Sequence, residues 1–309
     1  ANSDITATGL ISGYSANGTA ADITINSTNG SIQLENVSAV TDSGHGGNIE
    51  IRALNDITTG QVEASVWKQG DAGSIILDAG GNIATDKVRA VSKEGSGGTI
   101  DITAGGDFGT IPAFAGGTHL AVNTKYGGDA GSITVNAAGN INAGGIDANA
   151  PGGNGGSISL TSGGNLTGGA MTTGSLSGDG GPIYLKAAEN INIAETITGT
   201  WFGNAGSITI EVGGSITITS GAVYDFFQNN CGTSASGTVA CNDDGSVTLT
   251  PSDTMSLPGQ GLLAGPVKIT PIASSSGSSG TTTTPDSGSS DTTTTPDSGS
   301  SDTTTTPDS

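Results

Sequence analysis

The chain has 309 residues, including 54 Gly and 10 Pro, and its 8 Lys and Arg against 28 Asp and Glu give a formal net charge of −20. The glycines follow no strict triplet, which excludes collagen, and the acidic excess argues against nucleic acid or an anionic membrane surface as a partner. No apolar run approaches the roughly 20 residues of a spanning helix. The apolar residues are mostly Ile and Val, which indicates an all-β protein.

One short apolar strand, preceded by a Gly-rich turn, recurs along the chain. Seven copies read GGNIEI, AGSIIL, GGTIDI, AGSITV, GGSISL, GGPIYL and AGSITI. The spacings between successive first apolar residues are 26, 26, 25, 33, 25, 25, 25 and 39. The repeat is therefore about 25 residues long, with insertions near 109–119 and 224–242. We name the first apolar residues anchors: Ile23, Ile49, Ile75, Ile100, Ile133, Ile158, Ile183, Ile208 and Val247.

Two further strands follow each anchor. Their period-2 alternation of apolar and polar residues is typical of half-buried strands. The second strand is expected to begin at Ile32, Ile57, Ile83, Phe108, Ile141, Leu166, Ile191, Ile216 and Met255. The third is expected at Val37, Val62, Val88, Leu120, Ile146, Met171, Ile197 and Val223.

A single repeat of this kind cannot fold alone. Its half-dozen inward aliphatic side chains contribute roughly 1.5–3 kcal/mol each, whereas ordering 25 residues costs about 1–2 kcal/mol per residue. Stacked repeats share one continuous core, and parallel crossovers favour right-handed winding. We predict a right-handed parallel β-helix (β-solenoid) of triangular section, with three short strands per coil and about nine coils, over 1–273. A β-sandwich would not explain the fixed period.

A polar residue precedes the second strand in coil after coil. Asn, Asp and Ser tolerate sharp corners and can form hydrogen bonds between stacked coils. We therefore favour a structural ladder over a row of ligand-binding groups. This corner ladder comprises Ser31, Asp56, Asn82, Asp107, Asn140, Asn165, Asn190 and Ser215.

The segment GGDAGSITVNAAGNINAGGIDANAPGGNGGSISLTSGGNLTGG resembles the β-helical shafts of filamentous-haemagglutinin-type exoproteins of cyanobacteria and proteobacteria. The resemblance extends over residues 4–250. It implies a secreted protein at the bacterial cell surface that serves as an adhesin or surface fibre, and export by two-partner secretion. It implies no active site, because such shafts carry none.

The two cysteines, Cys231 and Cys241, lie ten residues apart in a Gly- and Ser-rich segment. A disulfide explains the pair better than a zinc site, because zinc needs three or four ligands and both histidines, His45 and His119, are distant in sequence. A disulfide would indicate an oxidising, extracytoplasmic compartment.

Many β-solenoids cleave polysaccharides, so we searched for catalytic groups. Gly44-His45-Gly46 superficially resembles a polygalacturonase motif, and Asn242-Asp243-Asp244 offers paired carboxylates. Eight coils separate the two segments, which is far beyond the reach of an acid–base pair. The basic residues Arg52, Lys68, Lys87, Arg89, Lys93 and Lys125 form no evident cluster with acids at repeat spacing. We expect no catalytic residues.

Calcium is a weaker possibility. Asp71, Asp129 and Asp179 occupy equivalent turns, with Asn154 and Asn204 in others. Stacked carboxylates repel unless a cation screens them, but turn conformation explains these residues adequately, and the nonapeptide rhythm of calcium-binding β-rolls is absent. We assign no metal site and no cofactor.

Aromatic residues gather near the ends of the third strands, at Tyr14, Trp67, Tyr126, Trp201 and Phe202. Exposed rings there could stack on sugars or on a neighbouring rod. The alternative is that they cover corners of the core.

The region 274–309 has a different composition. Its repeated unit TTTTPDSGSSD cannot build a core, and Thr clusters beside Pro are typical substrates of O-glycosylation. We predict a low-complexity tail. Its candidate glycosylation sites are Thr281, Thr282, Thr283, Thr284, Thr292, Thr293, Thr294, Thr295, Thr303, Thr304, Thr305 and Thr306.

The first strand-like segment of the chain corresponds to a second strand of the repeat, and the last one corresponds to a first strand. The last segment of one copy would therefore be followed, in the order of the repeat, by the first segment of another copy. Head-to-tail stacking would give a filament, whereas a longer protein cut within a coil would look the same. The candidate assembly edges are Asp4, Ile5, Thr6, Val267, Lys268 and Ile269. We expect an extracellular structural protein that assembles with itself and contacts surface glycans or receptors; the alternative is a secreted polysaccharide-binding or polysaccharide-cleaving β-helix enzyme.

Overall fold

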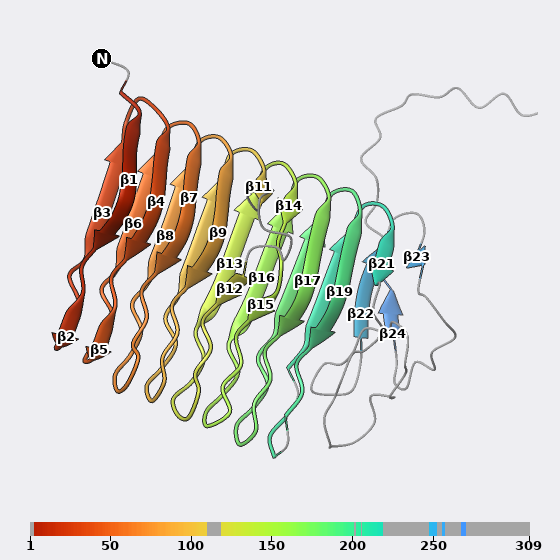
Figure 1. Cartoon of the computed structure of the whole chain (residues 1–309). Coiled ribbons are helices and arrows are strands. Elements are labelled where there is room, and N and C mark those ends of the chain that lie inside the picture. The colour runs from red at the N-terminus through yellow and green to blue at the C-terminus, as the bar shows by residue number, and fades with distance from the viewer. Residues whose placement is uncertain are drawn as a thin grey trace, which may run out of the picture. The chain divides into compact units, whose positions relative to one another are not determined.

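The computed structural model describes residues 3–109, 119–200, 202–204 and 206–218, together with three short strands within 247–269. The described residues contain strands and no helix, and they form about eight turns of a right-handed parallel β-solenoid (Figure 1). All strand pairs are parallel, and equivalent residues about 25 positions apart lie side by side. The predicted fold class is confirmed.

Sheet 1 consists of the predicted first strands. It has ten strands in the order β24-β22-β20-β18-β16-β13-β10-β8-β6-β3. The anchors pair directly with one another; Ile49, for example, pairs with Ile23 on one side and Ile75 on the other. The strands are β3 (Ile23–Ser27), β6 (Ile49–Ala53), β8 (Ile75–Ala79), β10 (Ile100–Ala104), β13 (Ser132–Ala137), β16 (Ser157–Ser162), β18 (Ile183–Ala187), β20 (Ile208–Val212), β22 (Val247–Pro251) and β24 (Val267–Ile269).

Sheet 2 contains both the second and the third predicted strands. In five described coils the two predicted strands form one continuous strand. In the coil of residues 57–63, for example, the inward residues Thr59 and Val62 are three positions apart instead of two. This step bends the strand while its pairing with the next coil continues. The strands are β1 (Ile5–Ser12), β4 (Ile32–Ser38), β7 (Ile57–Glu63), β9 (Ile83–Arg89), β11 (Phe108–Gly109), β12 (His119–Ala121), β14 (Ile141–Asn142), β15 (Ile146–Asp147), β17 (Leu166–Thr172), β19 (Ile191–Ile197), β21 (Ile216–Ile218) and β23 (Met255–Ser256).

The third side of each coil is less regular. It contains the two-stranded sheet of β2 (Ser15–Asn17) and β5 (Thr41–Ser43), and then single bridges such as Val66 to Ser92 and Ser92 to Thr124. Beyond these bridges the chain makes a narrow loop and returns to sheet 1. We call this loop the arm; in Figure 1 the arms project from the lower edge of successive coils.

Each arm closes on itself through one backbone hydrogen bond. The amide of Gly73 donates to the carbonyl of Ala64 (2.9 Å), and the amide of Gly156 donates to that of Ala148 (2.8 Å). The returning limb is a column of glycines stacked so closely that a Cβ on Gly156 would collide with the carbonyl oxygen of Gly131 in the coil before. This contact explains why Gly stands two residues before the anchor in each of the seven repeats from Gly47 to Gly206.

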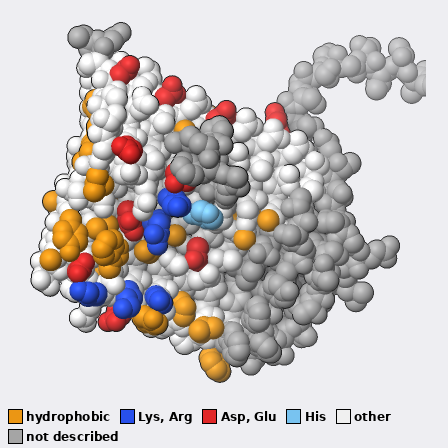
Figure 2. All heavy atoms as spheres, in the orientation of Figure 1, with side chains coloured by type: hydrophobic (Ala, Val, Ile, Leu, Met, Phe, Trp, Pro, Cys, Tyr) orange, Lys and Arg blue, Asp and Glu red, His pale blue; other side chains and the backbone are white. Residues whose placement is uncertain are grey.

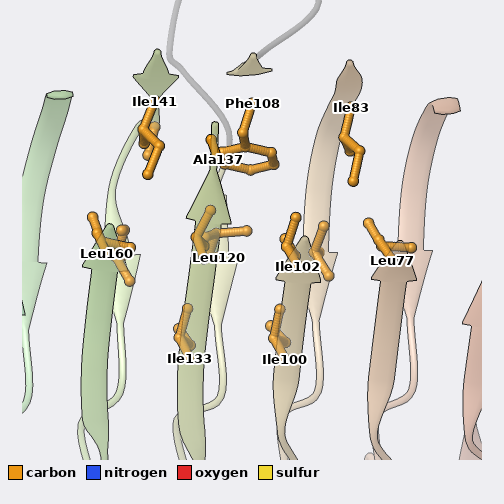
Figure 3. Close-up of a cluster of buried hydrophobic side chains, with 14 of the residues drawn as sticks. Leu77, Ile83, Ile100, Ile102, Phe108, Leu120, Ile133, Ala137, Ile141 and Leu160 are labelled. Atoms are coloured by element: carbon orange, nitrogen blue, oxygen red, sulfur yellow. The ribbon is translucent and has the colours of Figure 1, made fainter. Parts of the chain in front are cut away.

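The core lies between sheets 1 and 2. Ile83, Phe108 and Ile141 come from successive strands of sheet 2 and point into the interior in one column, opposite Ile102 and its neighbours from sheet 1 (Figure 3). Phe108 is 1% exposed and is among the largest fully buried side chains. The stacked aliphatic columns are what the 25-residue period predicts. Among the described residues no helix has the length and hydrophobicity needed to cross a membrane.

Candidate functional site

The corner ladder residues lie in one column along the solenoid. Each side-chain oxygen accepts a hydrogen bond from the backbone amide of the next member, over distances of 2.6–3.4 Å. Asn165, for example, accepts from the amide of Asn190 at 3.1 Å. Asp4, which the sequence assigns to an assembly edge, heads this column because its carboxylate accepts from the amide of Ser31 at 2.8 Å.

A second ladder runs along the arms and contains the residues considered for calcium. The carboxylate of Asp129 accepts from the amide of Asn154 (2.7 Å), and the carboxylate of Asp179 accepts from the amide of Asn204 (2.8 Å). Asp71 likewise accepts from Ser96. Within the described residues there is no group of three or more His, Cys, Asp or Glu side chains arranged to hold a metal ion. These oxygens are directed toward backbone amides of the next coil.

A groove lies where the outer face of sheet 2 meets the arms. Its volume is about 560 Å³, and residues from four consecutive coils line it. Figure 2 shows Lys and Arg side chains gathered on this face of the solenoid, beside hydrophobic side chains. The lining residues are Val66, Trp67, Arg89, Val91, Ser92, Lys93, Asn123, Thr124, Lys125, Asp147, Asn149 and Pro151.

The sequence spacing of the basic residues hides a grouping that the structure shows. Arg89, Lys93 and Lys125 line one groove together with Asp147. Lys93 and Lys125 are 32 residues apart in sequence (125 − 93), which hides their equivalence in a 25-residue repeat. The structure shows that Lys93 and Lys125 are equivalent, because the residues just before them, Ser92 and Thr124, are bridged to one another.

The three groove cations differ in their partners. Arg89 lies 3.7 Å from the carboxylate of Glu63. In the described part of the chain, neither Lys93 nor Lys125 has a carboxylate within 4.0 Å; instead their Nζ atoms lie 5.7 and 5.2 Å from the centroid of the Tyr126 ring. The groove thus holds two lysines whose charge is not neutralised, in a protein of net charge −20.

The aromatic residues near the arms are largely exposed. Trp67 is 53% exposed and Tyr126 is 59% exposed, so neither ring packs over a corner of the core. Tyr14 and Phe202 are exposed as well, and Trp201 lies outside the described residues. Trp67, Lys93 and Lys125 occupy equivalent positions in three successive coils, because each follows a residue of one line of bridges.

Asp147 is the acidic group of the groove. Its carboxylate accepts hydrogen bonds from the side-chain amide of Asn123 (2.7 Å) and the backbone amide of Asn149 (3.0 Å). Burial nevertheless raises the pKa of Asp147, because desolvation of the charged form outweighs these hydrogen bonds. Asp147 is therefore poorly solvated.

The histidine considered for catalysis does not lie in this groove. The His45 side chain is 64% exposed, and its Nδ1 lies 3.8 Å from the carboxylate of Asp71 on the arms. The acids proposed as its partners, Asn242-Asp243-Asp244, lie outside the described residues, as do Cys231, Cys241, the insertion 110–118 and the threonines of the tail.

The candidate assembly edges lie in strands at the ends of the two sheets. Within the described chain, β1, which contains Ile5 and Thr6, pairs on one side with β4, and β3 pairs on one side with β6. At the other end, β24, which contains Val267, Lys268 and Ile269, pairs with β22.

Comparison of the chain with protein families, with curated proteins and with solved structures finds no match. What can be concluded about function therefore rests on the solenoid, its ladders and the groove.

Proposed function

We propose that this protein is an extracellular structural β-solenoid that serves as the subunit of a surface fibre or as an adhesin shaft. The observation that carries the proposal is the continuity of stacking: between Asp4 and Ser215 successive described coils are joined by parallel sheets and by side-chain ladders. In a solenoid each coil contacts only its neighbours, so the same contacts repeated many times give a long, stiff body.

The resemblance to filamentous-haemagglutinin-type shafts supports the same role. Such shafts are β-helices built from repeats, and secretion to the cell surface as an adhesin follows from the resemblance. A disulfide between Cys231 and Cys241 and O-glycosylation of the tail threonines would both suit an extracellular site. Intact-mass measurement before and after reduction tests both modifications, since a disulfide adds two mass units on reduction and glycans add mass to the bare chain.

Assembly would proceed head to tail through the sheet edges. An edge strand presents unpaired amides and carbonyls, which are a template for another strand. In a parallel sheet the backbone groups of successive residues form hydrogen bonds alternately with the strand on one side and the strand on the other. The amide of Ile5 donates to the carbonyl of Ser31 in the next coil. The amide of Thr6 therefore points away from the next coil, to the side on which no described strand pairs with β1, and the same holds for Thr24 of β3, because Ile23 donates to Asn48.

The test is electron microscopy and sedimentation of the purified chain beside a Thr6→Pro/Thr24→Pro variant. Proline removes the amides at positions 6 and 24 while leaving the amides that pair with the next coil. The matched control is Thr6→Val/Thr24→Val, which keeps the amides. We expect rods that grow end to end for the native chain and the valine variant, and short rods for the proline variant. Dispersed short rods in all three samples would reject assembly.

Polysaccharide binding is the second candidate, and the groove favours it. Cleavage is less well supported. Glycosidases that use two carboxylates place them about 5–9.5 Å apart. Glu63 and Asp147 occupy equivalent positions three rungs apart, since Glu63 pairs with Arg89, Arg89 with Ala121 and Ala121 with Asp147. Three rungs correspond to about 14 Å. Release of reducing ends from polysaccharides by the native chain, lost in Asp147→Asn, would favour the enzyme.

A further inference from the structure

We propose that the groove between sheet 2 and the arms binds a linear acidic saccharide, in which Lys93 and Lys125 contact the acid groups and Trp67 contacts the sugar rings. This inference rests on the second candidate function, polysaccharide binding, whose ligand class it specifies, and it does not depend on filament assembly.

The charges in the groove favour an anionic ligand. Like charges in adjacent positions of a sheet destabilise it, and Lys93 and Lys125 lie in adjacent coils without a carboxylate within 4.0 Å in the described chain. Outside the groove, Lys68 pairs with Asp42 at 2.8 Å and Lys186 pairs with Glu211 at 3.1 Å. The two groove lysines are thus available to an anionic ligand.

The spacing of the groove residues along the solenoid favours a linear saccharide. Trp67, Lys93 and Lys125 repeat once per coil, and adjacent coils are about 4.8 Å apart. This rise is close to the length of one pyranose unit in an extended chain. A saccharide lying along the solenoid axis would therefore present successive sugar units to equivalent positions of successive coils.

The remaining lining residues fit a sugar. The exposed ring of Trp67 offers an apolar face for stacking, and the amide of Asn123 and the carboxylate of Asp147 are partners for hydroxyl groups. A volume of about 560 Å³ is within the roughly 300–1,000 Å³ of small-ligand sites. Outside the groove the acidic surface would repel a long polyanion, which favours a short acidic segment over nucleic acid.

The experiment measures binding to the full chain by calorimetry and by tryptophan fluorescence at low salt. The probes are a short oligogalacturonate, a sulfated dextran oligosaccharide, a neutral cello-oligosaccharide and an oligothymidylate. We expect binding of one or both acidic saccharides, and the stronger of the two identifies the acid group as carboxylate or sulfate. Added salt should weaken this binding, because the contacts are between charges.

Variants test the assignment of residues. Lys93→Gln/Lys125→Gln should weaken binding at least about tenfold, the equivalent of one charge-assisted contact. Lys186→Gln, which also removes a lysine charge but lies on sheet 1, should change it less than about twofold. Trp67→Ala should weaken binding and abolish the fluorescence change, whereas Asp147→Asn should tighten binding of the acidic probes. Circular dichroism checks that each variant is folded.

Three results would overturn the proposal: no binding of either acidic saccharide, equal binding of the neutral probe or the oligothymidylate, or equal losses in Lys186→Gln and the double groove variant. Because the proline variant of the edge strands keeps the groove, the same titration on that variant separates failure of binding from failure of assembly.

Discussion

Replacing one glycine of the returning limb should show how the coils are held together. Gly156 stacks on Gly131 in the coil before, and a Cβ at this position would lie 1.8 Å from the carbonyl oxygen of Gly131. Ordinary contact begins at 3.4 Å, so the two coils would have to separate locally by about 1.5 Å in Gly156→Ala.

The size of the effect follows from the hydrogen bonds around this contact. Two hydrogen bonds join the same two coils beside it: the amide of Ala130 donates to the carbonyl of Asn154 (2.9 Å), and the amide of Asn154 donates to the carboxylate of Asp129 (2.7 Å). A displacement of about 1.5 Å takes such bonds beyond hydrogen-bonding distance. With about 1 kcal/mol net for the bond between backbone groups and about 1.5–3 kcal/mol for the bond to the carboxylate, Gly156→Ala should lower the free energy of unfolding by about 2–4 kcal/mol.

Another glycine of the arms, Gly127, supplies the control. A Cβ on Gly127 would lie 3.9 Å from the carbonyl oxygen of Glu94, which is ordinary van der Waals contact. We expect Gly127→Ala to change stability by less than about 1 kcal/mol.

The assay is urea unfolding followed by circular dichroism, with hydrogen exchange to locate the loss. Solenoids can unfold coil by coil, and exchange identifies which coils open. In Gly156→Ala protection should fall first in the coils that contain residues 131, 156 and 181. Equal unfolding midpoints for the two alanine variants, or a uniform loss of protection along the chain, would refute the reasoning.

Three further predictions concern the ladder, the core and the groove. Asn165→Ala removes hydrogen bonds to the coils on both sides and should lower the unfolding free energy by about 1–2 kcal/mol, whereas Asn192→Ala, an exposed residue of β19, should have little effect in the same urea assay. Phe108→Ala opens a cavity at a residue that is 1% exposed and should cost about 3–5 kcal/mol, with a smaller loss in Phe108→Leu; equal losses would contradict the cavity explanation. The folded-state pKa of Asp147 is raised, so the folded chain binds more protons than the unfolded chain between the two pKa values, and stability falls as pH rises through that window. The stability gained in Asp147→Asn should therefore grow as pH rises above about 4, and a pH-independent difference would argue against a desolvated carboxylate.

The amino-acid sequence by itself determined the solenoid. Anchors such as Ile49, Ile75 and Ile100 repeat about every 25 residues, and a face of inward aliphatic residues that no single repeat can bury has to be covered by the next. The position of Asn or Asp before the second strand follows from the same repeat, because a residue at a fixed place in each coil meets its own equivalent in the next.

Tertiary structure decided what does not repeat. The sequence suggested separate second and third strands, but the step of three residues between Thr59 and Val62 lets one strand turn the corner without losing its pairing. Three of the groove residues, Arg89, Lys93 and Asp147, lie at unequal sequence spacings, yet all three line one groove in the folded chain. A periodic pattern encodes contacts between equivalent residues, whereas a site made from different residues of successive coils depends on how each coil bends, which no spacing records.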